Sequence, residues 1–155
     1  MLSKTHLVMS LFAGLLLISS VRNPIVFLLS VLGATFLPDL DSYNSKIGRR
    51  FSSRVITAFT RHRGIMHSLI FLFAAYFVLY LYVPSVSLGF LVGYSVHLFG
   101  DLLTRKGLRL FYPFGLRIRG FVKTGGRIES FIFLSFEVMD LLLIVKITFF
   151  HLLFY

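Results

Sequence analysis

The sequence predicts an all-α integral membrane protein, a helical bundle of about five membrane segments with the N-terminus inside the cell and the C-terminus outside. Apolar residues make up 57% of the 155 residues, and the mean hydropathy is +0.86. Only 14% of the residues are charged, which is well below the fraction found in soluble domains. The apolar residues also gather in runs separated by prolines or basic stretches. We therefore expect one membrane-embedded domain spanning residues 1–155.

The apolar runs give the order of the expected helices. The runs cover about residues 5–21, 24–38, 66–84, 86–103 and 130–155. A bilayer core of about 30 Å needs about 20 apolar residues per helix, so the first two runs are short for a full span. Pro24 and Pro84 mark two of the breaks, because proline disfavours helix in the residue before it. Two helical hairpins followed by a single C-terminal helix are therefore expected.

Basic residues orient this bundle, because they gather in the stretches 42–65 and 104–129, whereas the connections around Arg22 and Pro84 are nearly uncharged. By the positive-inside rule the two basic stretches are cytoplasmic. In so apolar a chain, the net charge of +10 favours anionic membrane lipid as a partner, with nucleic acid in second place. The expected location is the inner (plasma) membrane, crossed several times. The basic residues are Lys46, Arg49, Arg50, Arg54, Arg61, Arg63, Arg105, Lys106, Arg109, Arg117, Arg119, Lys123 and Arg127.

Ionisable residues converge on the same cytoplasmic end of the predicted helices. Such residues are costly near a membrane and usually face a functional interior. The alternative is that each one separately caps a helix or lies at the interface, which is how we interpret His151 at the opposite end. Glu137 and Asp140, with Lys146 nearby, are interpreted as a buried structural pairing. The convergent set is His6, Asp39, Asp41, His62, His67, His97, Asp101 and Glu129.

The chemistry of this set points to a metal. His97 and Asp101 are four residues apart, which on a helix puts them on one face with Cβ atoms about 6 Å apart. Two aspartates in Asp-x-Asp spacing, Asp39 and Asp41, can bridge a pair of cations. Histidine nitrogens favour zinc, iron or nickel over magnesium. The chain has no cysteine, so a divalent metal would depend on histidine and carboxylate.

The motifs LPDLDS, HRGIMHS, HLFGDLLTRKGLRLFYPF and GGRIES, preceded by His6, resemble the YdjM-like family of membrane-bound metal-dependent hydrolases, also described as LexA-binding inner-membrane-associated hydrolases. The resemblance covers nearly the whole chain. That family is similar to the zinc-dependent phospholipases C and the single-strand-specific zinc nucleases. In these all-α enzymes an early His, an Asp, a His and an HxxxD pair bind a zinc cluster. The resemblance implies one to three divalent metal ions, with zinc as the favoured metal, held by His6, Asp39, Asp41, His62, His67, His97 and Asp101.

The resemblance also implies a zinc-type phosphoester hydrolase acting at the cytoplasmic membrane face, with a lipid headgroup as the favoured substrate and nucleic acid less favoured. Asp41 and Glu129 are the expected catalytic groups, and Glu129 is either a ligand or a general base. A guanidinium donates two hydrogen bonds to a phosphate, so the expected substrate-binding residues are Arg61, Arg63 and Arg127. The soluble enzymes have a further His and a second HxxxE or HxxxD pair, whereas in this chain only Glu129 follows.

Two other classes of protein stay open. A non-catalytic regulatory or binding protein would use the basic cytoplasmic loops and would not need the metal ligands. A transporter or channel would need polar residues through the whole membrane depth. A transporter or channel ranks last, because the outer half of the predicted membrane bundle has almost no polar residues except Lys146 and His151.

Overall fold

The computed structural model describes the backbone of residues 1–41 and 64–154, and the side chains of residues 1–39 and 64–150. Within these ranges the chain is helical and forms no β-strand, which confirms the predicted all-α class. Three short 3-10 turns, η1 (Ile18–Ser20), η2 (Leu37–Asp41) and η3 (Ile65–His67), flank the helices. The α-helices of the described ranges are α1 (Ser3–Leu17), α2 (Pro24–Phe36), α5 (Leu69–Tyr82), α6 (Pro84–Leu102) and α7 (Arg127–Phe154).

Local sequence signals set the helix starts. Pro24 and Pro84 each occupy the first turn of a helix, where the missing N–H costs nothing and the fixed φ angle suits the helix. Ser68 caps α5, because its hydroxyl accepts a hydrogen bond from the Phe71 N–H at 3.2 Å. Helix α1 packs on α2, and α5 packs on α6, so both predicted hairpins are confirmed.

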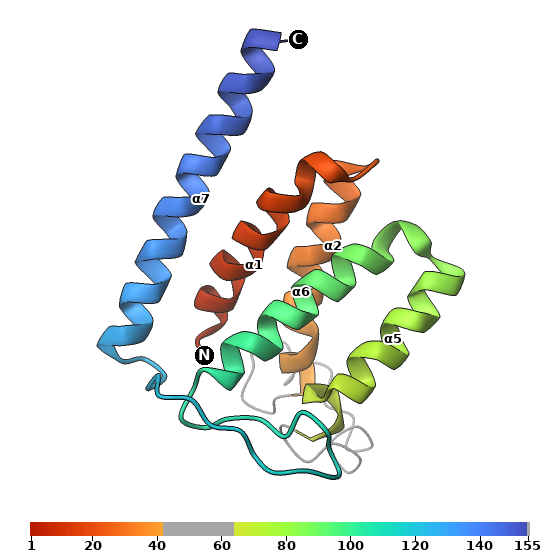
Figure 1. Cartoon of the computed structure of the whole chain (residues 1–155), viewed down its shortest axis with the longest axis vertical. Helices are drawn as coiled ribbons and strands as arrows, with labels where there is room; N and C mark the ends of the chain where they lie inside the picture. The colour runs from red at the N-terminus through yellow and green to blue at the C-terminus, as the bar shows by residue number, and fades with distance from the viewer. Residues whose placement is uncertain (42–63, 155) are drawn as a thin grey trace.

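Helix α6 lies at the centre of the bundle and contacts α1, α2 and α5 (Figure 1). The side chains between α2, α5 and α6 form the buried apolar core. Leu108, from the segment after α6, also enters this core, so that segment is anchored to the bundle. The core residues are Ala34, Leu72, Phe90, Tyr94, Leu98 and Leu108.

Glycines let α2 and α6 approach closely. A Cβ atom at Gly93 would lie only 2.0 Å from the carbonyl oxygen of Val31 on α2, and small residues are what permit such contact between apolar helices. Gly89 lies one turn earlier on the same stripe of α6. His97 and Asp101 continue that stripe at the same four-residue spacing, so close packing of α2 and α6 brings both side chains toward the end of α2.

Helix α7 packs chiefly along α1 and extends past the rest of the bundle (Figure 1). Phe136 meets Phe12 of α1 edge to face, with ring centroids 5.2 Å apart. Asp140, one turn further along α7, is only 4% exposed, and neither of its carboxylate oxygens forms a hydrogen bond with any described residue. No ion pair joins Asp140 to the exposed Lys146 in the described part of the chain, so the predicted pairing is wrong. The spacing of six residues rotates Lys146 about 240° around the helix from Asp140, onto another face.

Among the residues that the structure describes, two helical stretches are long and apolar enough to cross a membrane, Ser3–Ser20 and Pro84–Leu102. Two further apolar helices, Pro24–Asp39 and Leu69–Tyr82, are shorter. The predicted bundle of five membrane segments and its N-in, C-out orientation therefore stay predictions.

Candidate metal centre

Five of the predicted metal ligands come together at one end of the bundle. This is the end where α1 and α5 begin and where α2 and α6 finish (Figure 1). Four separate elements supply the side chains, so the cluster exists only in the folded chain. The five residues are His6 on α1, Asp39 on η2, His67 on η3, and His97 and Asp101 on α6.

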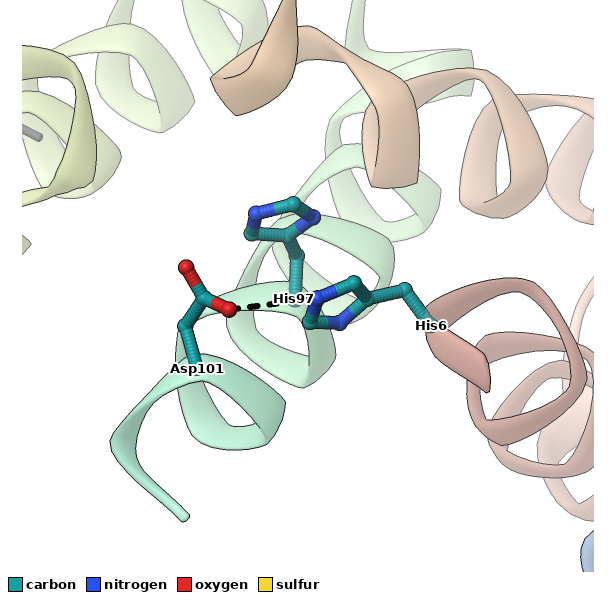
Figure 2. A group of neighbouring side chains, drawn as sticks. All are labelled: His6, His97 and Asp101. Atoms are coloured by element: carbon teal, nitrogen blue, oxygen red, sulfur yellow. Dashed lines mark ion pairs between the residues drawn. The ribbon is translucent and has the colours of Figure 1, made fainter. Parts of the chain in front are cut away.

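The three imidazole rings are packed against one another and are each about 1% exposed. The rings of His6 and His97 stack with centroids 4.1 Å apart and planes 15° apart. The ring of His67 meets that of His97 edge-on at 5.6 Å. Figure 2 shows His6 and Asp101 facing each other beside His97.

Two carboxylates face these rings at distances that suit a shared metal ion. His6 Nε2 lies 3.3 Å from Asp101 Oδ1, and His67 Nε2 lies 3.9 Å from Asp101 Oδ2. Asp39 Oδ1 lies 3.8 Å from Nε2 of both His67 and His97. Adjacent ligand atoms of a tetrahedral zinc ion, at metal distances of about 2.0 to 2.1 Å, are about 3.4 Å apart. Small movements of the side chains would therefore complete such a site.

Two overlapping groups of ligands result. His6, His97 and Asp101 form one group, and Asp39, His67 and His97 form the other. Within each group the candidate ligand atoms lie within 4.8 Å of one another. Asp101 turns one oxygen toward His6 and the other toward His67, so its carboxylate lies between the two groups and would be available to a metal in either.

A backbone carbonyl fixes the orientation of His97. Its Nδ1 lies 2.8 Å from the carbonyl oxygen of Thr35, and a carbonyl only accepts, so Nδ1 carries the proton and donates. The lone pair of Nε2 is then free to bind a cation, as in many histidine metal ligands. One lone pair binds one ion, so His97 serves only one of the two groups at a time.

The ring nitrogens that remain have no hydrogen-bond partner among the described residues. These are both nitrogens of His6, both nitrogens of His67, and Nε2 of His97. A buried polar atom left unpaired costs about 1 to 3 kcal/mol, so five of them in one cluster require an explanation. A divalent metal would bind several of these nitrogens together with the carboxylates. The residues present therefore fit a metal of the zinc class, which prefers nitrogen and carboxylate ligands.

The structure adds three contributors that the sequence analysis missed. The α-amino group of Met1 lies 2.5 Å from Asp101 Oδ1, so a positive charge already faces this carboxylate. The Thr35 carbonyl orients His97. Gly100 makes room for His6, because a Cβ atom there would lie 2.7 Å from His6 Nδ1. The four-residue spacing of Gly89, Gly93, His97 and Asp101 was a signal for the close packing of α2 on α6, which brings the Thr35 carbonyl to His97.

Glu129 lies at the same end of the bundle but belongs to neither ligand group. Its side chain is 1% exposed, and its two oxygens accept hydrogen bonds of 2.6 Å each from the N–H groups of Leu2 and Gly125. Burial acts to raise the pKa of Glu129, but these donors and the positive N-terminus outweigh it and hold the pKa below its ordinary value of 4.5. Its predicted part as ligand or general base stays a prediction.

The remaining predicted site residues are not placed in the cluster. Arg127 is exposed at the first residue of α7. Arg61, His62 and Arg63 lie outside the described residues, as does the side chain of Asp41.

A cavity of about 630 Å³ lies far from this cluster, between the opposite ends of α1 and α7. Almost all of its lining is apolar, which suits the acyl chain of a lipid better than a polar reactant. Lys146 is its one charged lining residue.

The helices are apolar, and three histidines and two aspartates meet at one end of the bundle. The fold and this cluster define an all-α protein with a candidate metal centre. The chain belongs to the family described as YdjM inner membrane protein, whose model matches residues 1–153. It is therefore an inner membrane protein of that family, as the sequence resemblance implies.

Several relatives match the chain over most of its length. YvsG of Bacillus subtilis (strain 168) is 32% identical over 116 residues, which cover 71% of this chain and 72% of YvsG. Inner membrane protein YdjM of Escherichia coli (strain K12) is 32% identical over 121 residues, covering 70% of this chain and 62% of that protein. YdjM of Shigella flexneri matches to the same extent. The chain thus spans less than two thirds of the length of the YdjM proteins, and no solved structure matches it significantly.

Proposed function

We propose that this protein is a membrane-bound, zinc-type phosphoester hydrolase whose metal centre faces the cytoplasm. The observation that carries the proposal is the buried set of three imidazoles facing two carboxylates, with ring nitrogens that have no hydrogen-bond partner among the described residues. A purely structural cluster would satisfy those nitrogens with hydrogen bonds. Metal ligands, in contrast, need the lone pairs free.

Each residue of the cluster has a defined part in the proposal. His6, His67 and His97 supply nitrogen ligands, and Asp39 and Asp101 supply oxygen ligands. A bound divalent metal would acidify a water molecule and neutralise negative charge on a phosphate. The Thr35 carbonyl holds His97 in the tautomer that leaves Nε2 free.

A phospholipid headgroup is the substrate that we favour. The protein belongs to an inner membrane family, and the proposed site lies at the end of the bundle that carries the basic residues. Arg127 is exposed at that end and would bind phosphate oxygens through its guanidinium. Asp41, Glu129, Arg61 and Arg63 keep their predicted catalytic and phosphate-binding parts.

The test is a cleavage assay with purified, zinc-loaded protein in lipid nanodiscs. We expect release of a phosphorylated headgroup from one class of phospholipid, and loss of turnover in Asp39→Asn, Asp41→Asn and Asp101→Asn. An amide is a neutral and weaker metal ligand than a carboxylate, so the loss follows from the chemistry. Glu137→Gln, an exposed carboxylate on α7, is the matched control and should keep full activity.

Two outcomes would count against the proposal. Full activity in all three Asn variants would remove the carboxylates from the mechanism. Absence of cleavage across phospholipids, nucleotides and single-stranded nucleic acid, by protein shown to contain metal, would favour the regulatory or binding class instead.

A further inference from the structure

We propose that the segment 104–126, between α6 and α7, is a binding surface for anionic phospholipid. In this proposal its exposed apolar side chains enter the membrane surface and its basic side chains hold lipid phosphates beside the metal centre. The lipid-binding surface does not depend on hydrolysis. Only the step from bound lipid to substrate rests on the proposed function.

The segment exposes large apolar side chains at its outer part. Leu116 is 90% exposed and Phe114 is 77% exposed, and neither lies on a helix that faces the membrane interior. Exposed apolar patches of this kind usually mark a contact with a membrane or another molecule. The exposed apolar side chains of the segment are Phe111, Phe114, Leu116, Ile118 and Phe121.

These side chains are exposed although the segment itself is folded and contributes to the core. Leu108 and Val122, from the same segment, are fully buried. The N–H of Leu108 donates to the Ile118 carbonyl at 2.9 Å, and the N–H of Ile118 donates back to the Leu108 carbonyl at 2.8 Å. Gly107, at φ +64°, makes the turn that this pairing requires. The segment is thus an ordered loop that buries one set of apolar residues and presents another.

The charges of the segment identify the partner. Basic residues alternate with the exposed apolar ones, and the sequence contains no acidic residue between Asp101 and Glu129. An anionic bilayer complements both features, because aromatic and aliphatic side chains enter the headgroup and acyl boundary while basic side chains attract lipid phosphates. Nucleic acid would match the charges but would leave Leu116 and Ile118 without an apolar environment. The exposed basic residues are Arg105, Lys106, Arg109, Arg117, Arg119 and Lys123.

Hydrogen bonds hold the segment next to the candidate metal centre. The hydroxyl of Thr104 donates to the carbonyl of Asp101 at 2.7 Å. The carbonyl of Leu110 accepts from the N–H of Leu69, two residues after His67, at 2.8 Å. Figure 1 shows the segment crossing the end of the bundle where the cluster lies. A headgroup bound on this surface therefore lies at the same end of the molecule as the candidate ligands.

The absence of tryptophan from the chain makes a direct test possible. In Phe114→Trp, the new indole is the only one in the protein and reports on its surroundings. We expect blue-shifted emission, and strong quenching by phospholipids brominated near the headgroup, in nanodiscs that contain anionic lipid. In purely zwitterionic nanodiscs the quenching should be much weaker.

Two further variants separate charge from general membrane contact. Adding Arg117→Gln and Arg119→Gln to Phe114→Trp should lower quenching in anionic nanodiscs to the zwitterionic level, whereas adding Arg22→Gln, at the opposite end of the bundle, should not. Ile25→Trp, exposed near Arg22, serves as the reference for an indole in contact with lipid whatever its charge.

Water-exposed emission at position 114 that brominated anionic lipid fails to quench would overturn the proposal. A spectral shift on adding a single-stranded oligonucleotide, without quenching by lipid, would overturn it in favour of nucleic acid. The readout needs neither metal nor turnover, so an inactive protein that is quenched as expected would refute only the proposed function.

Discussion

His6 and His97 stack their imidazole rings face to face, 4.1 Å apart, although they lie on helices from opposite halves of the chain. In this stack Nε2 of His6 lies 3.3 Å from Asp101 Oδ1, and Nε2 of His97 lies 3.8 Å from Asp39 Oδ1. Both rings therefore turn a nitrogen toward a carboxylate. Asp101 beside them provides the negative charge that a cation needs.

The first prediction concerns the shared ligand. Because His97 is a candidate ligand in either group, His97→Ala should remove more bound metal from detergent-purified protein than His6→Ala does. His6→Ala breaks only one group and should leave the Asp39 and His67 group able to bind. Elemental analysis of metal per chain measures both, with Glu137→Gln as the control. Equal metal content in wild type and His97→Ala would contradict the assignment.

A second prediction uses two glycines with opposite surroundings. A Cβ atom at Gly100 would lie 2.7 Å from Nδ1 and 2.8 Å from Cε1 of His6, so Gly100→Ala should displace the ring and weaken metal binding. A Cβ atom at Gly33 would meet nothing within 4 Å. Gly33→Ala should therefore keep its metal and gain up to about 1 kcal/mol of helix stability. Metal titration of both variants checks this, and unchanged affinity in Gly100→Ala would show that the His6 ring does not bind.

The sequence was sufficient to predict part of this site and insufficient for the rest. The i, i+4 spacing put His97 and Asp101 on one face, and the placement of polar residues by depth predicted that His6, Asp39 and His67 would meet them. The stacking of His6 on His97 could not be predicted. Helix α1 is apolar on nearly every side, so no amphipathic pattern shows which side faces α6.

Backbone partners were also beyond prediction. The Thr35 carbonyl reaches His97 only because α2 and α6 pack closely at Gly93, and sequence spacing does not report which carbonyl meets which ring. For Glu129 a cytoplasmic position could be predicted, but its hydrogen bonds to the N–H groups of Leu2 and Gly125 depend on how α1 and α7 align.

A third prediction concerns the buried carboxylate between α1 and α7. Asp140 has no hydrogen-bond partner in the described part of the chain and lies one turn beyond Phe136, which packs on Phe12. Asp140→Leu should stabilise the protein by about 1 to 3 kcal/mol, because it removes an unpaired polar group and adds apolar packing. Thermal unfolding in detergent should show a higher Tm. Glu137→Leu, at an exposed position of α7, is the control, and a lower Tm for Asp140→Leu would show that the carboxylate stabilises the fold and would contradict the prediction.

A fourth prediction concerns the pH dependence of Glu129, which precedes the apolar run that begins at residue 130. Its pKa is lower in the folded chain than its ordinary value of 4.5, so its ionised form stabilises the fold. That contribution is fully present above the unfolded pKa and is lost as the pH falls through the folded pKa. Glu129→Gln should lower Tm at pH 7, and the difference in Tm between the variant and wild type should disappear at acidic pH. A difference in Tm that stays constant down to pH 3 would show that ionised Glu129 does not stabilise the fold.

The last prediction tests the orientation that places the metal centre in the cytoplasm. Because the chain has no cysteine, single cysteines can be introduced without removing native ones. Lys106 and Arg22 are both exposed and lie at opposite ends of the bundle. By the positive-inside rule, a cysteine at position 106 should react with a membrane-impermeant maleimide only when the cytoplasmic side is opened. A cysteine at position 22 should react from outside in intact cells whose layers outside the inner membrane have been made permeable to the reagent. Both variants replace an exposed basic residue, so each is the matched control for the other in expression and folding. The reverse pattern would put the histidine cluster on the outer face, and with it a substrate pool other than the cytoplasmic leaflet.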